Sequence, residues 1–290
     1  MFKNIIIYRF KKPDNDISPT LDEFVPCGST QEKSLGWVPP REAHGKLIEV
    51  IGGNSILKLL TETKSVPTDV LTRKAAERAR EINHNEGRKP SKKEMREIKE
   101  DMKLALLPHA FAKRTATTVM FTKDGFLLID ASNQSKADDA ITMLVRAFDG
   151  LVVTLINTNK SPATSMANWL IEQEPPHGFS IDRECELKAA DESKAVVKYG
   201  RHPLDIDEVK AHVESGKLPT KLAMTYNART SFVLTEAMTL KKVQFLDVVF
   251  EDQSGEGHED GFDADMTIIA GEMQPLLNGL IEVLGGEMEI

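Results

Sequence analysis

The sequence of 290 residues has only two cysteines, Cys27 and Cys185, which stand far apart along the chain. A disulfide framework or a cysteine-based zinc site needs more thiols at closer spacing, so we expect two reduced thiols. The seven histidines form neither an HExxH nor an HxH pattern. The chain therefore predicts no metal site built on cysteine or histidine, and we expect no cofactor.

Long apolar runs are also missing. No stretch approaches the roughly 20 apolar residues that a membrane-spanning helix needs, so we expect no membrane partner. The first ten residues are apolar over a few positions only and lack a signal-peptide cleavage pattern, which favours a buried strand in a cytoplasmic protein. Because GxxxxGKS/T, GxSxG and GxGxxG are absent, phosphate-loop, hydrolase-elbow and dinucleotide functions lack their first requirement.

Positive charge is in deficit overall but is unevenly distributed. The chain has 37 lysines and arginines against 45 aspartates and glutamates, for a net charge of −8. Residues 72–114 nevertheless carry 13 basic and 7 acidic residues, whereas residues 251–290 carry 11 acidic residues and no lysine or arginine. A polarised chain can present a basic face to nucleic acid while its acidic face points elsewhere. The simpler alternative is that the basic segment is only the solvated face of a helix.

The basic segment has the pattern of two amphipathic helices joined by a short loop. Thr68 is placed to cap the first helix, expected over about 69–82, and a polar loop follows over 83–90. Ser91 and Glu94 form a capping box that begins the second helix. Packing of the two apolar stripes would form an antiparallel hairpin with a set of outward basic side chains: Arg73, Lys74, Arg80, Lys92, Lys93, Arg96 and Lys99.

Strand patterns outside this segment occur in clusters with helices at irregular intervals, which is typical of an α+β fold with mixed or antiparallel sheets. Turn residues stand at 26–28 and in the GWVPP segment at 36–40. The end of the chain, 263–286, fits either a strand followed by a helix or one helix kinked at Pro275. Expected strands cover 2–10, 46–51, 54–61, 115–122, 126–131, 151–156, 194–199, 219–227, 230–236 and 239–249, and expected helices begin near Ser135, Ser161 and Asp205.

These elements divide into three expected regions. A central α+β region comprises residues 1–66 and 115–178, and the basic helical hairpin of residues 67–114 would project from it. Residues 179–290 would form a C-terminal α+β region with an acidic tail segment.

The acidic end of the chain offers the best candidate for catalysis. Asp263 and Asp265, with Glu251, Glu259 and Asp260 near in sequence, could hold Mg²⁺ for phosphodiester cleavage. If the segment is extended, the carboxylates of Asp263 and Asp265 lie on one face. The competing interpretation is a solvated acidic edge or a helix N-terminus, because DxD is common and no catalytic lysine or histidine stands in an evident relation to it.

Two further segments combine basic and aromatic or loop residues. Phe111 follows the end of the second helix and precedes Lys113 and Arg114, so it is either a core residue or an interface anchor beside a phosphate-contacting pair. The loop at 199–203 carries Arg201 and His202. It would either present Arg201 to a phosphate or simply connect a strand to a helix.

A set of short motifs follows one order along the chain: Phe2-Lys3-Asn4 with Tyr8-Arg9, Pro26-Cys27-Gly28, Gly36-Trp37-Val38-Pro39-Pro40, Leu106-Leu107-Pro108 with Ala110-Phe111, Phe262-Asp263-Ala264-Asp265, Gly271-Glu272 and Leu284-Gly285-Gly286-Glu287. The ordered set resembles the RdgC family of recombination-associated proteins over residues from about 2 to 287. The GWVPP and FDAD segments are the most specific parts of this resemblance.

The resemblance implies a cytoplasmic, nucleoid-associated DNA-binding protein without enzymatic turnover. It implies a head-to-head, tail-to-tail homodimer closed into a ring, whose basic hole encircles duplex DNA with little sequence preference and which restrains RecA-promoted strand exchange. The interface phenylalanine of the family falls on Phe111, and a basic loop facing DNA falls on Arg201 and His202. Together with the hairpin, this gives the expected DNA-binding residues: Lys113, Arg114, Arg201, His202, Arg73, Lys92, Lys93 and Arg96.

Two other functions compete with this interpretation. One is a Mg²⁺-dependent exodeoxyribonuclease that uses Asp263 and Asp265. The other is an acidic protein-interaction module whose C-terminal segment mimics DNA and binds a recombination protein directly.

Overall fold

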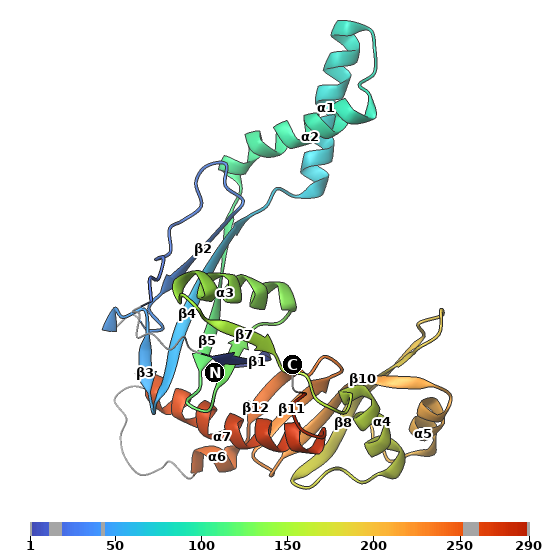
Figure 1. The fold of residues 1–290 in the computed structure, drawn as a ribbon. Helices are drawn as coiled ribbons and strands as arrows, with labels where there is room; N and C mark the ends of the chain where they lie inside the picture. The colour runs from blue at the N-terminus through green and yellow to red at the C-terminus, as the bar shows by residue number, and fades with distance from the viewer. Residues whose placement is uncertain (1, 12–18, 42–43, 252–260, 289–290) are drawn as a thin grey trace. The chain divides into compact units, whose positions relative to one another are not determined.

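The computed structural model describes residues 2–11, 19–41, 44–251 and 261–288. Over these ranges the chain is α+β, as predicted, with seven α-helices and twelve strands in one antiparallel sheet (Figure 1). No helix in the described ranges is long and apolar enough to cross a membrane. The sheet has the order β2 (Lys33–Val38), β4 (Asn54–Lys64), β5 (Ala112–Phe121), β6 (Phe126–Asp130), β1 (Ile5–Lys11), β12 (Leu240–Phe245), β11 (Thr230–Thr235), β10 (Lys217–Tyr226), β8 (Phe179–Ala189) and β9 (Val196–Gly200), with β3 (Glu49–Ile51) paired to β4 and β7 (Val152–Leu155) paired to β1.

The chain forms two compact units. The large unit comprises residues 1–20, 39–57 and 118–290, and the small unit comprises Leu21–Val38 and Lys58–Thr117. Strands β4 and β5 contribute residues to both units. The helices of the large unit are α3 (Gln134–Ala147), α4 (Pro162–Glu172), α5 (Asp207–Glu214), α6 (Asp247–Glu251) and α7 (Gly261–Val283), and those of the small unit are α1 (Thr68–Glu86), α2 (Lys92–Leu106) and the short 3₁₀ helix η2 (Leu107–His109).

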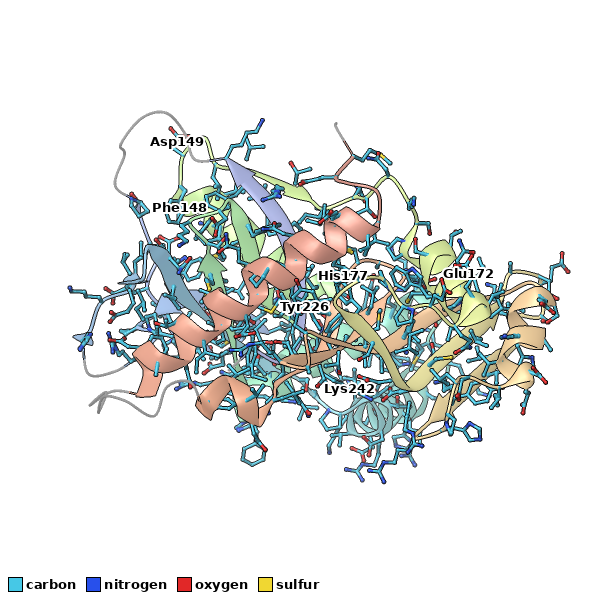
Figure 2. The ribbon with its side chains drawn as sticks, turned by 90° about the horizontal axis from the view of Figure 1, so that it is seen from below. Phe148, Asp149, Glu172, His177, Tyr226 and Lys242 are labelled. Carbon is cyan, nitrogen blue, oxygen red and sulfur yellow. The ribbon has the colours of Figure 1, made fainter. Side chains whose placement is uncertain are left out.

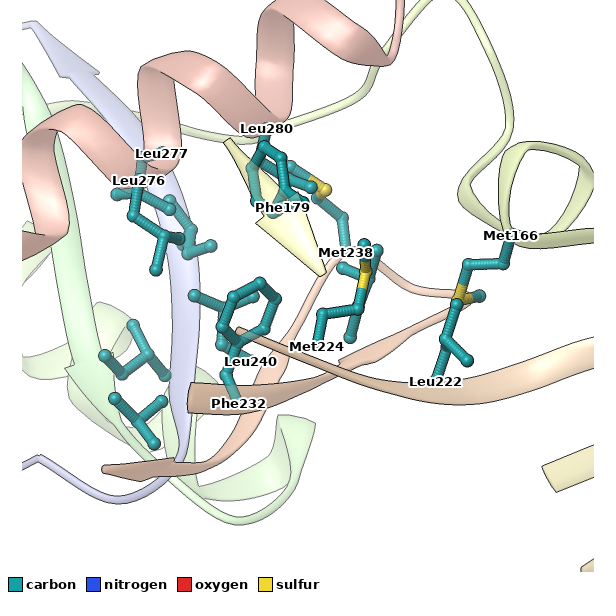
Figure 3. Packing of buried hydrophobic residues seen from close by; sticks show 14 of the residues in the cluster. Met166, Phe179, Leu222, Met224, Phe232, Met238, Leu240, Leu276, Leu277 and Leu280 are labelled. Atoms are coloured by element: carbon teal, nitrogen blue, oxygen red, sulfur yellow. The ribbon is translucent and has the colours of Figure 1, made fainter. Parts of the chain in front are cut away.

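The core of the large unit lies between α7 and one face of strands β10–β12. Side chains alternate along a strand, so every second residue of these strands points to the same face. Figure 3 shows Leu276, Leu277 and Leu280 of α7 directed toward this face. Tyr226 lies beside α7 (Figure 2), and its hydroxyl would be 3.3 Å from a Cβ at Gly279, so a glycine lets the helix approach closely. The strand residues that complete the packing are Leu222, Met224, Phe232, Leu234 and Leu240.

The end of the chain is one helix, because α7 continues from Gly261 to Val283 with Pro275 inside it. The alternative that placed a strand before the helix is wrong. Ile268 and Ile269 favour strands by their β-branched shape, but both are buried in the large unit. Burial of an apolar helix face therefore outweighs a local preference that amounts to a fraction of a kcal/mol per residue.

The helical hairpin of the small unit forms as predicted, except that Thr68 does not cap α1: Pro67 stands at the cap position, and Thr68 is the first residue of the helix. Ser91 accepts a hydrogen bond from the backbone of Glu94, whose carboxylate accepts from the backbone of Ser91 at 2.7 Å, so the predicted capping box is confirmed. Helix α1 runs four residues beyond the expected end and stops at Gly87, which adopts the left-handed conformation. Figure 1 shows both helices beyond the ends of β2, β4 and β5, so the hairpin projects from the strands of its own unit.

The prediction of a turn over the GWVPP segment is wrong for its first half. Residues Lys33–Val38 form β2, which pairs with β4, and Trp37 is buried. Gly36 lies against the backbone of Phe24 so closely that any Cβ would overlap it. This glycine is present because another segment of backbone passes over the strand, not because the chain turns there.

Three other expectations need correction. Strand β8 was not predicted, although it is the central partner of β9 and β10. Helix α3 is capped by Asn133, which accepts from the backbone of Lys136 at 3.1 Å, rather than by the serine two residues later. Helix α5 begins after Ile206 without a side-chain cap, so Asp205 does not cap it.

Candidate nucleic-acid interface

One face of the sheet in the large unit carries a group of lysines. We call this group the lysine face: Lys188 of β8, Lys198 of β9, Lys221 of β10, and Lys241 and Lys242 of β12. Neighbouring residues Leu187, Leu222 and Leu240 point into the core instead, because successive side chains of a strand alternate between faces. The adjacent Lys241 and Lys242 line the same hollow because β12 is bulged there: its register with β11 shifts, and Lys242 has a positive φ of 52°. The face is therefore the side of these strands that is turned away from the core.

The register of the sheet places Lys198 and Lys221 on either side of one residue of β8. Lys198 of β9 lies opposite Glu186 of β8, and Glu186 lies opposite Lys221 of β10. Lys241 of β12 lies opposite Val233 of β11. Strands lie about 4.8 Å apart, so Lys198 and Lys221, which are two strands apart, are separated by roughly 10 Å across the sheet.

Two glutamates lie among the lysines. The carboxylate of Glu186 contacts Lys221 at 2.9 Å and Lys198 at 3.0 Å, and that of Glu184 contacts Lys242 at 2.6 Å. Burial would raise the pKa of Glu186, but hydrogen bonds from Lys221, Lys198 and Thr220 outweigh it and lower the pKa to about 2. Five lysines against two glutamates still leave the lysine face with an excess of positive charge.

The lysine face is hollowed but offers no platform for stacking bases. A hollow of about 370 Å³ is lined by four of the five lysines, both glutamates, Asn4 and Val233. The aromatic residue that borders it, Tyr199, is buried, and its hydroxyl donates to Glu208 at 3.0 Å. Among the described residues, the exposed large aromatic side chains are Phe111 and Phe250, and neither belongs to these strands. The face is thus suited to the phosphate backbone rather than to unstacked bases.

Sequence reasoning missed the lysine face because its members lie on four separate strands. No short segment of the chain contains more than two of them. A signal exists in β8, where Glu184, Glu186 and Lys188 alternate with Cys185 and Leu187, which is the period-2 pattern of a half-buried strand. The neighbouring strands add their lysines only once the register is known.

A second basic group lies on α2 in the small unit. Lys92, Arg96, Lys99 and Lys103 follow one another at intervals of four, three and four residues, so they share one face of the helix. We call them the basic row of α2. Glu94, Glu97 and Asp101 lie on the other side of the helix, because a residue advances by about 100° around its axis, whereas Glu100 borders the row beside Arg96 and Lys103.

Ion pairs distinguish the basic residues of the hairpin. Lys93 lies 3.9 Å from Glu97, and Lys103 of the basic row lies 2.7 Å from Glu32. The other members of the row have no carboxylate within 4.0 Å among the described residues of the small unit, and the same holds for Arg73. All seven side chains predicted to point outward are exposed, which confirms that part of the prediction: Arg73, Lys74, Arg80, Lys92, Lys93, Arg96 and Lys99.

Phe111 is 96% exposed, so it is not a core residue of this chain. It follows η2 and precedes β5, where Lys113 is exposed and its carbonyl accepts from Thr63. Arg114 is engaged within the small unit: its Nε lies 2.7 Å from the carboxylate of Glu62, and its guanidinium lies over the ring of Phe24. Of the two basic residues predicted to contact phosphate here, Lys113 is the freer one.

The loop with Arg201 and His202 belongs to the large unit, whereas the hairpin belongs to the small unit. Arg201 is exposed and has a positive φ of 56°, which few residues other than glycine adopt. The backbone of His202 donates to the carbonyl of Arg183 at 3.1 Å, and its ring contacts the carbonyl of Pro203 at 2.7 Å. The loop thus holds Arg201 outward in a defined conformation.

The proposed pair of metal-binding carboxylates is not assembled. Asp263 and Asp265 lie in helix α7, where residues two apart point in nearly opposite directions, so the condition of an extended segment fails. Asp263 instead lies 2.9 Å from Arg41, whose guanidinium also binds the buried carboxylate of Glu49 at 3.1 Å. In the described ranges no group of three His, Cys, Asp or Glu side chains could hold a metal ion. Glu259 and Asp260 lie outside these ranges.

Both cysteines are free thiols, as predicted. Cys185 is buried, and burial raises its pKa to about 12. Cys27 is half-buried, and burial and then the neighbouring Glu62 also raise its pKa. Thiolates are the reactive form of cysteine, so neither side chain has the properties of a nucleophile.

Comparison with known proteins gives one consistent result. The profile of a family described as "RdgC: Putative exonuclease, RdgC" matches residues 1–287. A protein of Cupriavidus necator named recombination-associated protein RdgC is 42% identical over 295 residues, which cover 99% of this chain and 98% of that protein. Proteins of the same name from Janthinobacterium sp. and Bordetella pertussis are 40% and 41% identical over 99% and 100% of this chain, and in each case 99% of the relative is covered.

Proposed function

This chain belongs to the RdgC family of recombination-associated proteins, and on that premise we propose that it binds double-stranded DNA without sequence preference and without enzymatic turnover. The observation that carries the proposal is the lysine face, a group of cationic side chains gathered on one side of the sheet in a molecule whose net charge is −8. A uniformly acidic protein would repel DNA, whereas a concave basic surface concentrates positive potential locally.

The composition of the face supports duplex rather than single-stranded DNA. Lysines contact phosphates as point charges and carry no information about base sequence. Proteins that hold single strands add exposed aromatic side chains on which bases stack. The lysine face has none, and so the proposed contact is with the regularly spaced phosphates of a duplex.

We further propose that two copies of the chain close around the DNA as a head-to-head, tail-to-tail homodimer. The support is Phe111, because a fully exposed phenylalanine is costly in water and is typical of an interface anchor. A two-fold ring presents each basic group twice to one duplex. Lys92, Arg96, Lys113 and Arg201 are the other basic residues proposed to contact DNA, with Arg73, Lys93 and His202 beside them.

In this proposal, the protein restrains RecA-promoted strand exchange because it occupies the duplex. A ring on a duplex blocks the homology search or the growth of a filament simply by covering the DNA, and no catalytic step is needed. The protein would then be found in the cytoplasm on the nucleoid. The alternative of an acidic module predicts direct binding to a recombination protein in the absence of DNA, which a pull-down with nuclease-treated components distinguishes.

A salt titration of DNA affinity tests the proposal. The double variant Lys221→Ala/Lys241→Ala removes two cations from the lysine face, and Lys160→Ala is the control, an exposed lysine of the same unit outside the face. Affinity for a labelled duplex of random sequence should fall by about tenfold or more, and the slope of log K against log salt should become shallower by roughly 1 to 2. Unchanged affinity and slope in the double variant would overturn the assignment.

A further inference from the structure

The two glutamates of the lysine face occupy most of its lysines in the DNA-free protein. Glu186 contacts Lys198 and Lys221 at 3.0 and 2.9 Å, and Glu184 contacts Lys242 at 2.6 Å. Lys188 and Lys241 have no carboxylate within 4.0 Å in the described ranges. Three of the five cations are therefore already paired before a phosphate arrives.

The position of Glu186 is fixed more firmly than that of a typical surface glutamate. It is the cross-strand neighbour of both Lys198 and Lys221, so the sheet register places it between them. Its side chain is 18% exposed, and its second oxygen accepts a hydrogen bond from Thr220 at 2.9 Å. The pKa near 2 keeps this carboxylate ionised at every pH at which a DNA duplex is stable.

We propose that Glu184 and Glu186 compete with DNA phosphates for the lysines of the face and thereby set how tightly the protein holds DNA. This inference rests on the proposed function and concerns the regulation of the same site. A phosphate that binds Lys198, Lys221 or Lys242 must displace a carboxylate from it, so the new contact is offset by the one that is lost. Lys188 and Lys241 can bind phosphate without such a loss.

The lysine face should therefore have a lower affinity for DNA than its five lysines would otherwise give. Each cation that neutralises a phosphate contributes roughly 0.9 to the slope of log K against log salt. A lysine already paired with a carboxylate releases fewer counterions than this, because it enters the complex with its charge partly neutralised. The salt dependence contributed by the face should therefore correspond to fewer lysines than the five it contains.

A purely structural role of Glu186 predicts the opposite outcome. If the carboxylate only holds Lys198 and Lys221 in place, its removal would let these side chains spread and would weaken DNA binding. The two roles can be separated with glutamine, which keeps the shape of glutamate and can still accept from Thr220 but carries no charge.

The experiment compares three single variants of the full chain on one labelled duplex. Glu186→Gln and Glu184→Gln remove the competing carboxylates, and Glu214→Gln is the matched control. Glu214 of α5 is exposed, lines neither hollow that contains the lysines of the face, and makes no ion pair among the described residues. Affinity at about 0.15 M salt should rise by roughly 3- to 10-fold for the first two, and the slope should steepen by about 2 and about 1, respectively. The control should change little.

The lysine variants make failure of this inference distinguishable from failure of the proposed function. Weaker binding by Lys221→Ala/Lys241→Ala without tighter binding by either glutamine variant overturns the competition but leaves the DNA-binding face in place. If none of these variants changes DNA binding, the lysine face is not the DNA-binding site. If Glu186→Gln lowers the melting temperature, Glu184→Gln decides the question, because Glu184 is 39% exposed and contributes less to packing.

Discussion

The Nε atom of Arg114 lies 2.7 Å from the carboxylate of Glu62. Arg114 follows the exposed Phe111 by only three residues. The side chain of Glu62 is 3% exposed and also accepts from the backbone of Cys27 at 2.8 Å. The ion pair therefore joins the beginning of β5 to β4 inside the small unit. Arg114 holds the strand that follows Phe111, and its charge is largely engaged before any DNA binds.

Replacement of Arg114 by alanine should lower thermal stability, because the buried carboxylate of Glu62 would lose its charged partner. Lys113→Ala is the matched control, since the neighbouring lysine is exposed and has no carboxylate partner within 4.0 Å among the described residues. Calorimetry should show a lower melting temperature for Arg114→Ala only, and a salt titration should show a shallower slope, by about 1, for Lys113→Ala only. The reverse assignment of the two effects would contradict this interpretation.

Phe111→Ala should dissociate the proposed dimer without destabilising the subunit. The ring makes almost no contact within the chain, whereas an aromatic anchor in a partner can contribute about 2 kcal/mol or more to association. Sedimentation should show a shift toward monomer and DNA affinity should fall, while the melting temperature of the monomer stays the same. Phe250→Ala is a control with another exposed phenylalanine. A variant that remains dimeric would remove Phe111 from the interface.

The basic row of α2 should contribute to DNA binding more than its paired neighbour. Arg96→Gln and Lys99→Gln each remove a cation without a carboxylate within 4.0 Å, whereas Lys93→Gln removes one that lies 3.9 Å from Glu97. We expect a loss of affinity of roughly threefold or more for each of the first two, with a shallower salt slope, and a smaller change for the third. Equal effects at all three positions would show that the local pairing does not matter.

The capping box should make the stability of the hairpin depend on pH. Hydrogen bonds from the backbone of Ser91 and from Arg88 lower the pKa of Glu94 from 4.5 to about 2. Because the folded-state pKa is depressed, this stabilisation is present above pH 4.5 and is lost as the pH falls toward 2. The melting temperature of the wild type should exceed that of Glu94→Gln at pH 6, and the difference should vanish between pH 4.5 and pH 2. Glu97→Gln, outside the capping box, should show no such trend.

Incubation of labelled DNA with Mg²⁺ tests the absence of turnover. Asp263 and Asp265 diverge around α7, so no cleavage is expected from this pair. Asp263→Asn should instead reduce stability, because Arg41 would lose one of its two carboxylate partners. Magnesium-dependent digestion that Asp263→Asn abolishes would establish the nuclease instead.

The helices of the small unit could be predicted because their signals are local. The capping box of Ser91 and Glu94 and the apolar stripes lie within single segments, and the structure contains both helices. Gly36 could not be interpreted correctly as part of a strand, since the reason for the glycine is the backbone of Phe24, which passes over it. A contact of this kind leaves no periodic pattern in the sequence.

The candidate site was predicted in part for the same reason. Phe111 and the basic residues of the hairpin follow from short segments, and the structure places them at the surface. The lysine face depends on the pairing of β8 with β9 and β10, and Glu186 with Lys198 and Lys221 becomes a cluster only in that register. Because β8 was not predicted, the lysine face could not be recognised from the sequence.

Because the cations are concentrated on one face of an acidic protein, the rate of association with DNA and the lifetime of the complex should depend on different charges. At low ionic strength, where the Debye length is about 30 Å at 0.01 M, an approaching duplex would be repelled by the net charge of −8 before it reaches the lysine face. Only at contact do Lys188 and Lys241 act on it. Added salt should thus speed the encounter while it shortens the lifetime of the complex, and stopped-flow mixing would show the two rates rising together. Under the proposed function, this balance of charge predicts that the protein would reach DNA by chance collision rather than by long-range attraction.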